Sequence, residues 1–72
     1  MKNFSISRLA NTVLKQRKLL SLTQQEVADM AGINRSMLCR LENQDYEPSL
    51  DQLTRLGNAL QFDITAVFVE YT

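Results

Sequence analysis

The sequence of 72 residues contains no histidine, a single cysteine, a single proline and two glycines. A single cysteine excludes a disulfide bond within the chain, and without histidine we expect no zinc site. No apolar run reaches the roughly 18 residues that a membrane-spanning helix needs, and the first residues lack the apolar segment of a signal peptide. We therefore expect one small domain in the reducing cytoplasm.

The residue types on which most enzymes rely are also missing. The chain has no histidine, no glycine-rich phosphate loop and no cluster of metal ligands, and its acids are scattered at helix starts and on surfaces. An active site needs such groups brought together in one pocket. We expect no catalysis, no cofactor and no metal.

The formal net charge is zero, but the charges are unevenly distributed. Residues 1–43 hold seven basic and three acidic side chains, a balance of +4, whereas residues 44–72 hold one basic and five acidic ones, a balance of −4. A polyanion would therefore meet one part of the chain and avoid the other. The alternative is ordinary scatter of charges over a surface.

Residues 23–43 predict two short helices joined by a tight turn. Thr23 and Glu26 have the spacing of a capping box, in which each side chain binds the other residue's backbone N–H. Gly32 follows the first helix, at a position where glycine adopts a positive φ without strain. Asn34 can cap the second helix, which is expected to end at about residue 43. The positions expected to face inward are Val27, Ala31, Ile33, Leu38 and Leu41.

Two helices in this arrangement form a helix-turn-helix, whose second helix lies in the major groove of DNA. Ala28 is small at the point where the two helices must approach each other. The rival interpretation is a helical hairpin that binds no DNA, or only protein. Because capping, turn and apolar positions agree, we expect double-stranded DNA as the partner.

A helix capped by Ser5 or Ser7 is predicted before the motif, ending near Leu20. Arg17 would extend its apolar stripe by one turn, and a charge there needs a partner. Glu42, at the end of the second motif helix, is the candidate for a structural ion pair; the alternative is a solvated arginine. The stripe itself consists of Ile6, Leu9, Ala10, Val13 and Leu14.

A fourth helix is predicted after the polar loop that ends in Pro48. Ser49 and Gln52 have capping-box spacing, so the helix should cover about residues 50–60. Gly57 lies in its middle, where it can allow a close helix approach. The predicted buried stripe consists of Leu50, Leu53, Leu56 and Leu60.

The tail, residues 62–72, is rich in β-branched and aromatic residues that alternate with a period of two, which favours a strand. The rival is a short fifth helix capped by Asp63. No other strand is predicted in this chain, so the strand would pair with a second copy in a homodimer. The dimer interface would then consist of Phe62, Ile64, Ala66 and Phe68.

From about residue 14 to residue 60 the sequence resembles the Cro/cI-type (XRE) helix-turn-helix family of bacterial and phage repressors. The resemblance implies an all-α, four-helix λ-repressor-like domain, or one with a fifth helix, that binds palindromic operator DNA as a homodimer. It is carried by Arg17, the segment Leu22-Thr23-Gln24-x-Glu26-Val27-Ala28, Ala31-Gly32-Ile33, Ser36, Leu38, Arg40-Leu41-Glu42-Asn43, Pro48-Ser49-Leu50, Leu53 and Ala59-Leu60.

The tail departs from the family pattern, which usually ends in a short fifth helix. Its alternating residues look more like HipB-type antitoxins, whose C-terminal strand pairs across a dimer. That likeness would imply a toxin kinase of the HipA type as a protein partner. A restriction–modification controller is a further alternative within the same family.

The second motif helix should enter the groove with its N-terminal end forward. The expected base contacts are Arg35, Ser36, Met37 and Arg40. Arginine can bond both O6 and N7 of guanine, and methionine offers apolar contact only. Gln24 matches the family position that holds the first motif helix on the phosphate backbone; the other expected phosphate contacts are Thr23, Asn43 and Gln44.

Overall fold

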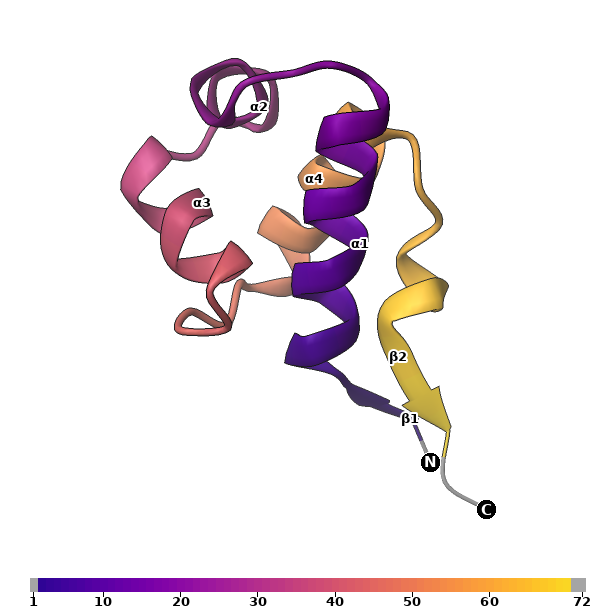
Figure 1. Ribbon diagram of the computed structural model, residues 1–72. Coiled ribbons are helices and arrows are strands. Elements are labelled where there is room, and N and C mark those ends of the chain that lie inside the picture. Colours follow the sequence, from indigo (N-terminus) through magenta and orange to yellow (C-terminus); the bar gives the residue numbers. More distant parts are fainter. Residues whose placement is uncertain (1, 71–72) are drawn as a thin grey trace.

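The computed structural model describes the backbone of residues 2–70 and the side chains of residues 5–65 and 67. Figure 1 shows four helices packed around one core, with a small sheet where the two chain ends meet. The elements are β1 (Lys2–Phe4), α1 (Ile6–Leu19), α2 (Gln24–Ala31), α3 (Arg35–Glu42), α4 (Leu50–Leu60), the 3-10 helix η1 (Ile64–Val67) and β2 (Phe68–Glu70). The predicted four-helix domain is confirmed.

The helices begin where the sequence places their caps. Ser5, and not Ser7, accepts a hydrogen bond from the backbone N–H three residues on, and Asn34 does the same for α3. Both predicted capping boxes are complete, with Thr23 starting α2 and Ser49 starting α4. Gly32 ends α2 with a φ of 69°, the left-handed conformation expected of a glycine there.

The core draws side chains from all four helices and from the tail. Leu50 was predicted to be buried as part of the apolar stripe on α4. This prediction is wrong, because Leu50 is 65% exposed. It is the first residue of α4, one turn before the point where that helix meets its neighbours. The buried cluster consists of Leu9, Val13, Val27, Ala31, Leu38, Leu41, Leu53, Leu56, Leu60 and Val67.

The predicted strand is wrong over the first part of the tail. Ile64–Val67 forms a 3-10 helix, and Oδ1 of Asp63 accepts a hydrogen bond of 3.0 Å from the N–H of Thr65. This local side-chain cap favours a turn despite the β-branched residues. Val67, which an alternating strand would turn to the other face, is fully buried. The rival prediction of a short helix capped by Asp63 lies closer to the structure.

The last part of the tail is a strand, but its partner lies in the same chain. β2 pairs antiparallel with β1, in the register Lys2↔Glu70 to Phe4↔Phe68, and the N–H of Ser5 donates to the carbonyl of Val67 over 2.9 Å. The expectation that the chain holds no second strand is therefore wrong. A three-residue strand is too short to show an alternating pattern.

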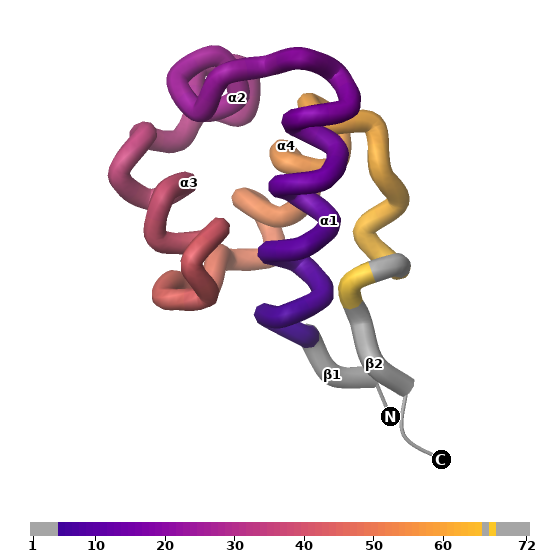
Figure 2. Tube along the Cα trace, viewed as in Figure 1, coloured from indigo at the N-terminus to yellow at the C-terminus, as the bar shows by residue number. Residues whose placement is uncertain are grey.

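The tail packs on its own chain before it reaches the sheet. Figure 2 shows the segment after α4 running back beside α1. Phe62 and Ile64, two of the four residues predicted at a dimer interface, are half-buried against this chain's core. The side chains of Ala66 and Phe68, the other two, lie outside the described residues.

Gly57 is where the tail comes closest to α4. The expected close approach exists, but it is made by the tail, including the first residue of η1, and not by another α-helix. A Cβ at position 57 would lie 2.9 Å from Cγ2 of Ile64 and 3.0 Å from the carbonyl oxygen of Phe62. The backbone contact cannot be relieved by a change of rotamer.

We expect Gly57→Ala to destabilise the fold by about 1–3 kcal/mol, because overpacking outweighs the gain of about 1 kcal/mol in helix propensity. Urea unfolding of both proteins measures the difference. Asn58→Ala is the matched control, since Asn58 is exposed on the same helix and the change there should be neutral or slightly stabilising. Equal stabilisation by both substitutions would contradict the packing at Gly57.

Candidate nucleic-acid interface

α2 and α3 form the predicted pair of helices around Gly32. The N–H of Ile33 donates to the carbonyl of Ala28 over 3.0 Å, which closes the turn after α2. Leu38 and Leu41 turn one face of α3 into the core. The opposite face is exposed and carries Ser36, Cys39 and Arg40, with Arg35 exposed in the first turn. Met37 is only half-exposed, so it lies at the margin of this face.

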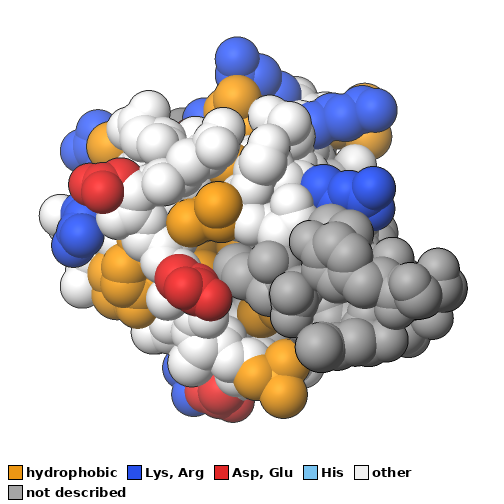
Figure 3. All heavy atoms as spheres, turned by 90° about the horizontal axis from the view of Figure 1, so that it is seen from below, with side chains coloured by type: hydrophobic (Ala, Val, Ile, Leu, Met, Phe, Trp, Pro, Cys, Tyr) orange, Lys and Arg blue, Asp and Glu red, His pale blue; other side chains and the backbone are white. Residues whose placement is uncertain are grey.

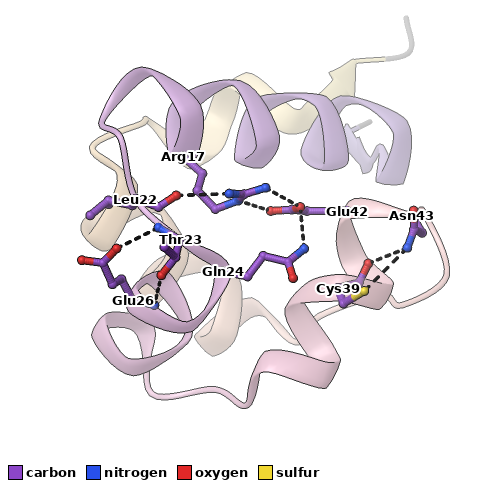
Figure 4. A network of polar contacts seen from close by, with 8 residues as sticks. All are labelled: Arg17, Leu22, Thr23, Gln24, Glu26, Cys39, Glu42 and Asn43. Carbon is purple, nitrogen blue, oxygen red and sulfur yellow. Dashed lines mark hydrogen bonds and ion pairs between the residues drawn. The ribbon is translucent and has the colours of Figure 1, made fainter.

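The ion pair predicted between Arg17 and Glu42 is present. Nε of Arg17 lies 2.7 Å from Oε2 of Glu42, and Nη2 donates to Oε1 over 3.1 Å (Figure 4). The third nitrogen, Nη1, donates to the carbonyl of Leu22 over 3.1 Å. The hydrogen bonds that Arg17 donates to Glu42 raise the pKa of Arg17 above its usual value, against the opposing effect of burial. α1 is thereby joined to the end of α3 and to the start of α2.

Gln24 belongs to the same network, which the sequence analysis did not predict. Its Nε2 donates to Oε1 of Glu42 over 3.0 Å (Figure 4). An amide nitrogen carries two hydrogens, so one remains for the expected phosphate contact. The structure explains this further donor, because a bidentate arginine still leaves lone pairs on a carboxylate that is only 7% exposed.

A shallow hollow lies beside this network. About 600 Å³ of open space separates the first turns of α2 and α3. The guanidinium of Arg35 and the first backbone N–H groups of α2 face this hollow, a combination that suits an anion such as a phosphate, whereas the charge of Arg17 is already paired with Glu42. Its lining residues are Arg17, Ser21, Leu22, Thr23, Gln24, Gln25 and Arg35. Thr23 and Gln24, expected at phosphates, and Arg35, expected at a base, are thus brought together.

The other expected contacts lie at the far end of α3. Arg40 is bent back onto the following loop, where its Nη2 donates to the carbonyl of Asp45 over 3.1 Å. Asn43 caps α3, and its Nδ2 donates to the carbonyl of Cys39 over 3.0 Å. Gln44 is exposed at a φ of 61°. The sequence analysis did not predict the link between Arg40 and Asp45.

Basic side chains concentrate on the first helix. α1 contains four Lys or Arg residues and no acidic one. Figure 3, which views the molecule from the end where the small sheet lies, shows basic side chains alone along the upper and right parts and both signs together on the left and below. The segregation of charge predicted from the sequence is thus clear for α1 and weaker near the loop that follows α3.

The described residues contain no group of three or more histidine, cysteine, aspartate or glutamate side chains placed to hold a metal ion. Within the same residues, every helix is too short or too polar to cross a membrane.

Comparison with known proteins places these features in context. The helix-turn-helix family model HTH_3 matches residues 13–67. Over 68 residues the chain is 32% identical to the immunity repressor protein of Bacillus phage phi105, a match that covers 94% of this chain and 45% of that protein. This chain therefore spans less than half of the phage protein's length.

In two further matches this chain covers a larger share of the other protein's length. Over 48 residues the chain is 40% identical to an uncharacterized HTH-type transcriptional regulator of Methanothermobacter thermautotrophicus, covering 67% of this chain and 70% of that protein. The crystal structure of the restriction-modification controller protein C.AhdI from Aeromonas hydrophila superposes with a TM-score of 0.79 at 21% identity, covering 86% of this chain and 94% of that one. At that identity the likeness shows the fold alone.

Removing one partner of the buried ion pair should destabilise the domain. We expect Arg17→Met to cost about 3 kcal/mol, because it leaves the Glu42 carboxylate buried without its cation. Thermal or urea unfolding measures the loss. Arg55→Met, which breaks the exposed pair with Asp51 (2.8 Å), is the matched control and should cost less than about 1 kcal/mol.

A double variant separates the charge from the packing. Arg17→Met combined with Glu42→Leu should be more stable than Arg17→Met alone, because no buried charge is left without a partner. If the double variant loses as much unfolding free energy as the two single variants together, the electrostatic explanation of this contact is wrong.

Proposed function

Because the chain belongs to the helix-turn-helix family HTH_3, we propose that it is a transcriptional repressor that binds double-stranded operator DNA in a sequence-specific manner. The observation that carries the proposal is the exposure of Arg35 and Ser36 in the first turn of α3, beside the N-terminus of α2. This is the end of a recognition helix that enters the major groove. The protein would act in the cytoplasm, on bacterial or phage DNA, without catalysing a reaction.

Base contacts and phosphate contacts are assigned to different elements. Arg35 and Ser36 read base edges, with Arg40 one turn further along and Met37 at the margin of the exposed face. Thr23 and Gln24 bind a phosphate at the start of α2, where the hollow collects positive charge. Asn43 and Gln44 reach the backbone at the other end of α3; such contacts set the register without reading sequence.

We propose a homodimer that binds a palindromic operator. Half-sites should lie about one helical turn, or ~34 Å, apart, since a two-fold protein requires a two-fold site. The tail remains the proposed contact region, because a two-stranded sheet leaves an outer edge on each strand for a further strand. Phe62 and Ile64 contribute only what their own core leaves exposed.

Two other roles stay as alternatives. The hypothesis of a toxin-binding antitoxin rests on a tail strand that pairs between two chains. In this structure β2 pairs instead with β1 of its own chain. Because β2 already has a partner in its own chain, the tail no longer favours an antitoxin over other repressors. A restriction–modification controller remains compatible with the fold. A toxin gene, or a methylase and a nuclease gene, beside this one would identify either role.

The division between base and phosphate contacts is testable on a duplex that the wild-type protein selects from a random pool. Arg35→Ala should lose the preference at one base pair and about 5- to 150-fold in affinity, which corresponds to 1–3 kcal/mol. Gln24→Ala should weaken binding to the selected and to a scrambled duplex by the same factor, with the salt slope unchanged because glutamine carries no charge. Fluorescence anisotropy at several salt concentrations measures both effects.

Asn58→Ala is the control for the phosphate contact. Asn58 also carries an amide side chain, and it is exposed on α4, outside the residues that line the hollow. We expect its removal to leave DNA binding almost unchanged. Should Arg35→Ala and Gln24→Ala alter both duplexes alike, the assignment of roles would fail; if the wild type selects no sequence at all, the proposed function would fail with it.

A further inference from the structure

Arg40 extends from the exposed face of α3 and meets the loop that follows it. Its Nη2 donates to the carbonyl of Asp45 over 3.1 Å, and its Nε lies 3.6 Å from the Asp45 carboxylate. The central carbon of the guanidinium lies 5.7 Å from the centre of the Tyr46 ring, within the range of a cation–π contact. Two neighbouring loop residues thus hold one arginine of the proposed recognition helix.

The loop is itself fixed at both of its ends. The N–H of Asp45 donates to the carbonyl of Arg40 over 2.7 Å, which closes the turn after α3. The hydroxyl of Tyr46 donates to Oε1 of Gln52 over 3.0 Å, and the same oxygen accepts the backbone N–H of Ser49 over 3.0 Å. Because Gln52 is part of the capping box of α4, the ring that supports Arg40 is tied to a rigid helix.

We propose that Asp45 and Tyr46 are positioning residues that orient Arg40 for contact with a guanine of the operator, an inference that rests on the proposed function. A guanidinium offers two edges to a bidentate acceptor: the side edge of Nε and Nη2, and the end edge of Nη1 and Nη2. Asp45 occupies the side edge. The end edge stays available for O6 and N7 of a guanine.

This arrangement affects specific and non-specific binding in opposite directions. An arginine already held in one plane loses less freedom when it binds a base, so its orientation favours the specific complex. The Asp45 carboxylate also offsets part of the positive charge of Arg40 and repels phosphates, which weakens binding to any duplex. Selectivity is the difference in binding free energy between the operator and other duplexes, so both effects raise it.

The test compares variants on a duplex selected by the wild-type protein from a random pool and on a scrambled duplex of the same length. Asp45→Ala removes the carboxylate beside Nε of Arg40 and keeps the backbone carbonyl that accepts from Nη2. It should weaken binding to the selected duplex about threefold to tenfold, part of the 5- to 150-fold value of a bidentate guanine contact. It should strengthen binding to the scrambled duplex, and the preference at the base pair read by Arg40 should decline.

Glu47→Ala is the matched control, because it removes the same charge from an exposed position of the same loop. It should strengthen binding to both duplexes by similar factors. Tyr46→Phe keeps the ring under Arg40 but loses the hydroxyl bond to Gln52, so base preference should decline less than in Asp45→Ala. Thermal unfolding of each variant checks that the fold is retained.

A double-mutant cycle shows whether Asp45 acts through Arg40. In an Arg40→Ala background, Asp45→Ala should no longer change base preference, whereas a purely structural role would persist there. If Asp45→Ala strengthens binding to both duplexes as Glu47→Ala does, or changes neither, the orienting role is contradicted while the proposed function stands. Failure of the wild type to select any sequence would instead overturn the proposed function.

Discussion

The arrangement of the three N-terminal helices depends on one largely shielded ion pair, whose side chains are 15% (Arg17) and 7% (Glu42) exposed. Arg17 of α1 uses all three of its side-chain nitrogens, two on Glu42 at the end of α3 and one on the carbonyl that precedes α2. Gln24 adds a bond from the first residue of α2 to the same carboxylate. Removing two charges from water is costly, and the cost is offset only when the remaining lone pairs and hydrogens are satisfied. Here each side-chain nitrogen of Arg17 and each carboxylate oxygen of Glu42 has at least one partner, because these groups converge from three helices.

The directional character of these bonds matters more for the proposed site than their contribution to stability. Apolar packing tolerates small rotations of a helix, whereas a bidentate arginine fixes distance and plane together. The pair thereby sets the position of the N-terminus of α2 relative to α3. Without it, the separation between Gln24 in that network and Arg35 across the hollow would not be fixed.

The sequence predicted the helices well because the signals for them are local. Thr23 with Glu26, Asn34, Gly32 and Ser49 each act on backbone groups within three or four residues, so their roles can be read without knowledge of the fold. The ion pair was also predictable, since a charged residue that extends an apolar stripe needs a partner. Positions on the exposed face of α3 follow from the same helical period.

The rest depended on contacts that a linear pattern does not encode. The strand at residues 2–4 is too short to show a period, and it is specified only by its pairing with the other end of the chain. The turn at Asp63 competes with the β-branched residues after it, and tertiary packing of Val67 decides the outcome. The orientation of Arg40 reflects a choice among rotamers, which depends on Asp45 and Tyr46 after the loop has folded.

The central claim is that the N-terminus of α2 and the exposed face of α3 form the surface that meets DNA. Backbone amide chemical shifts, recorded while a duplex selected by the protein is added to the labelled protein, test this claim most directly. The account predicts that the largest changes fall on residues 23–25 and 34–44, with the exposed residues of α4 almost unchanged. Changes centred on α4 around Arg55 and Asn58, with residues 34–37 unaffected, would contradict it.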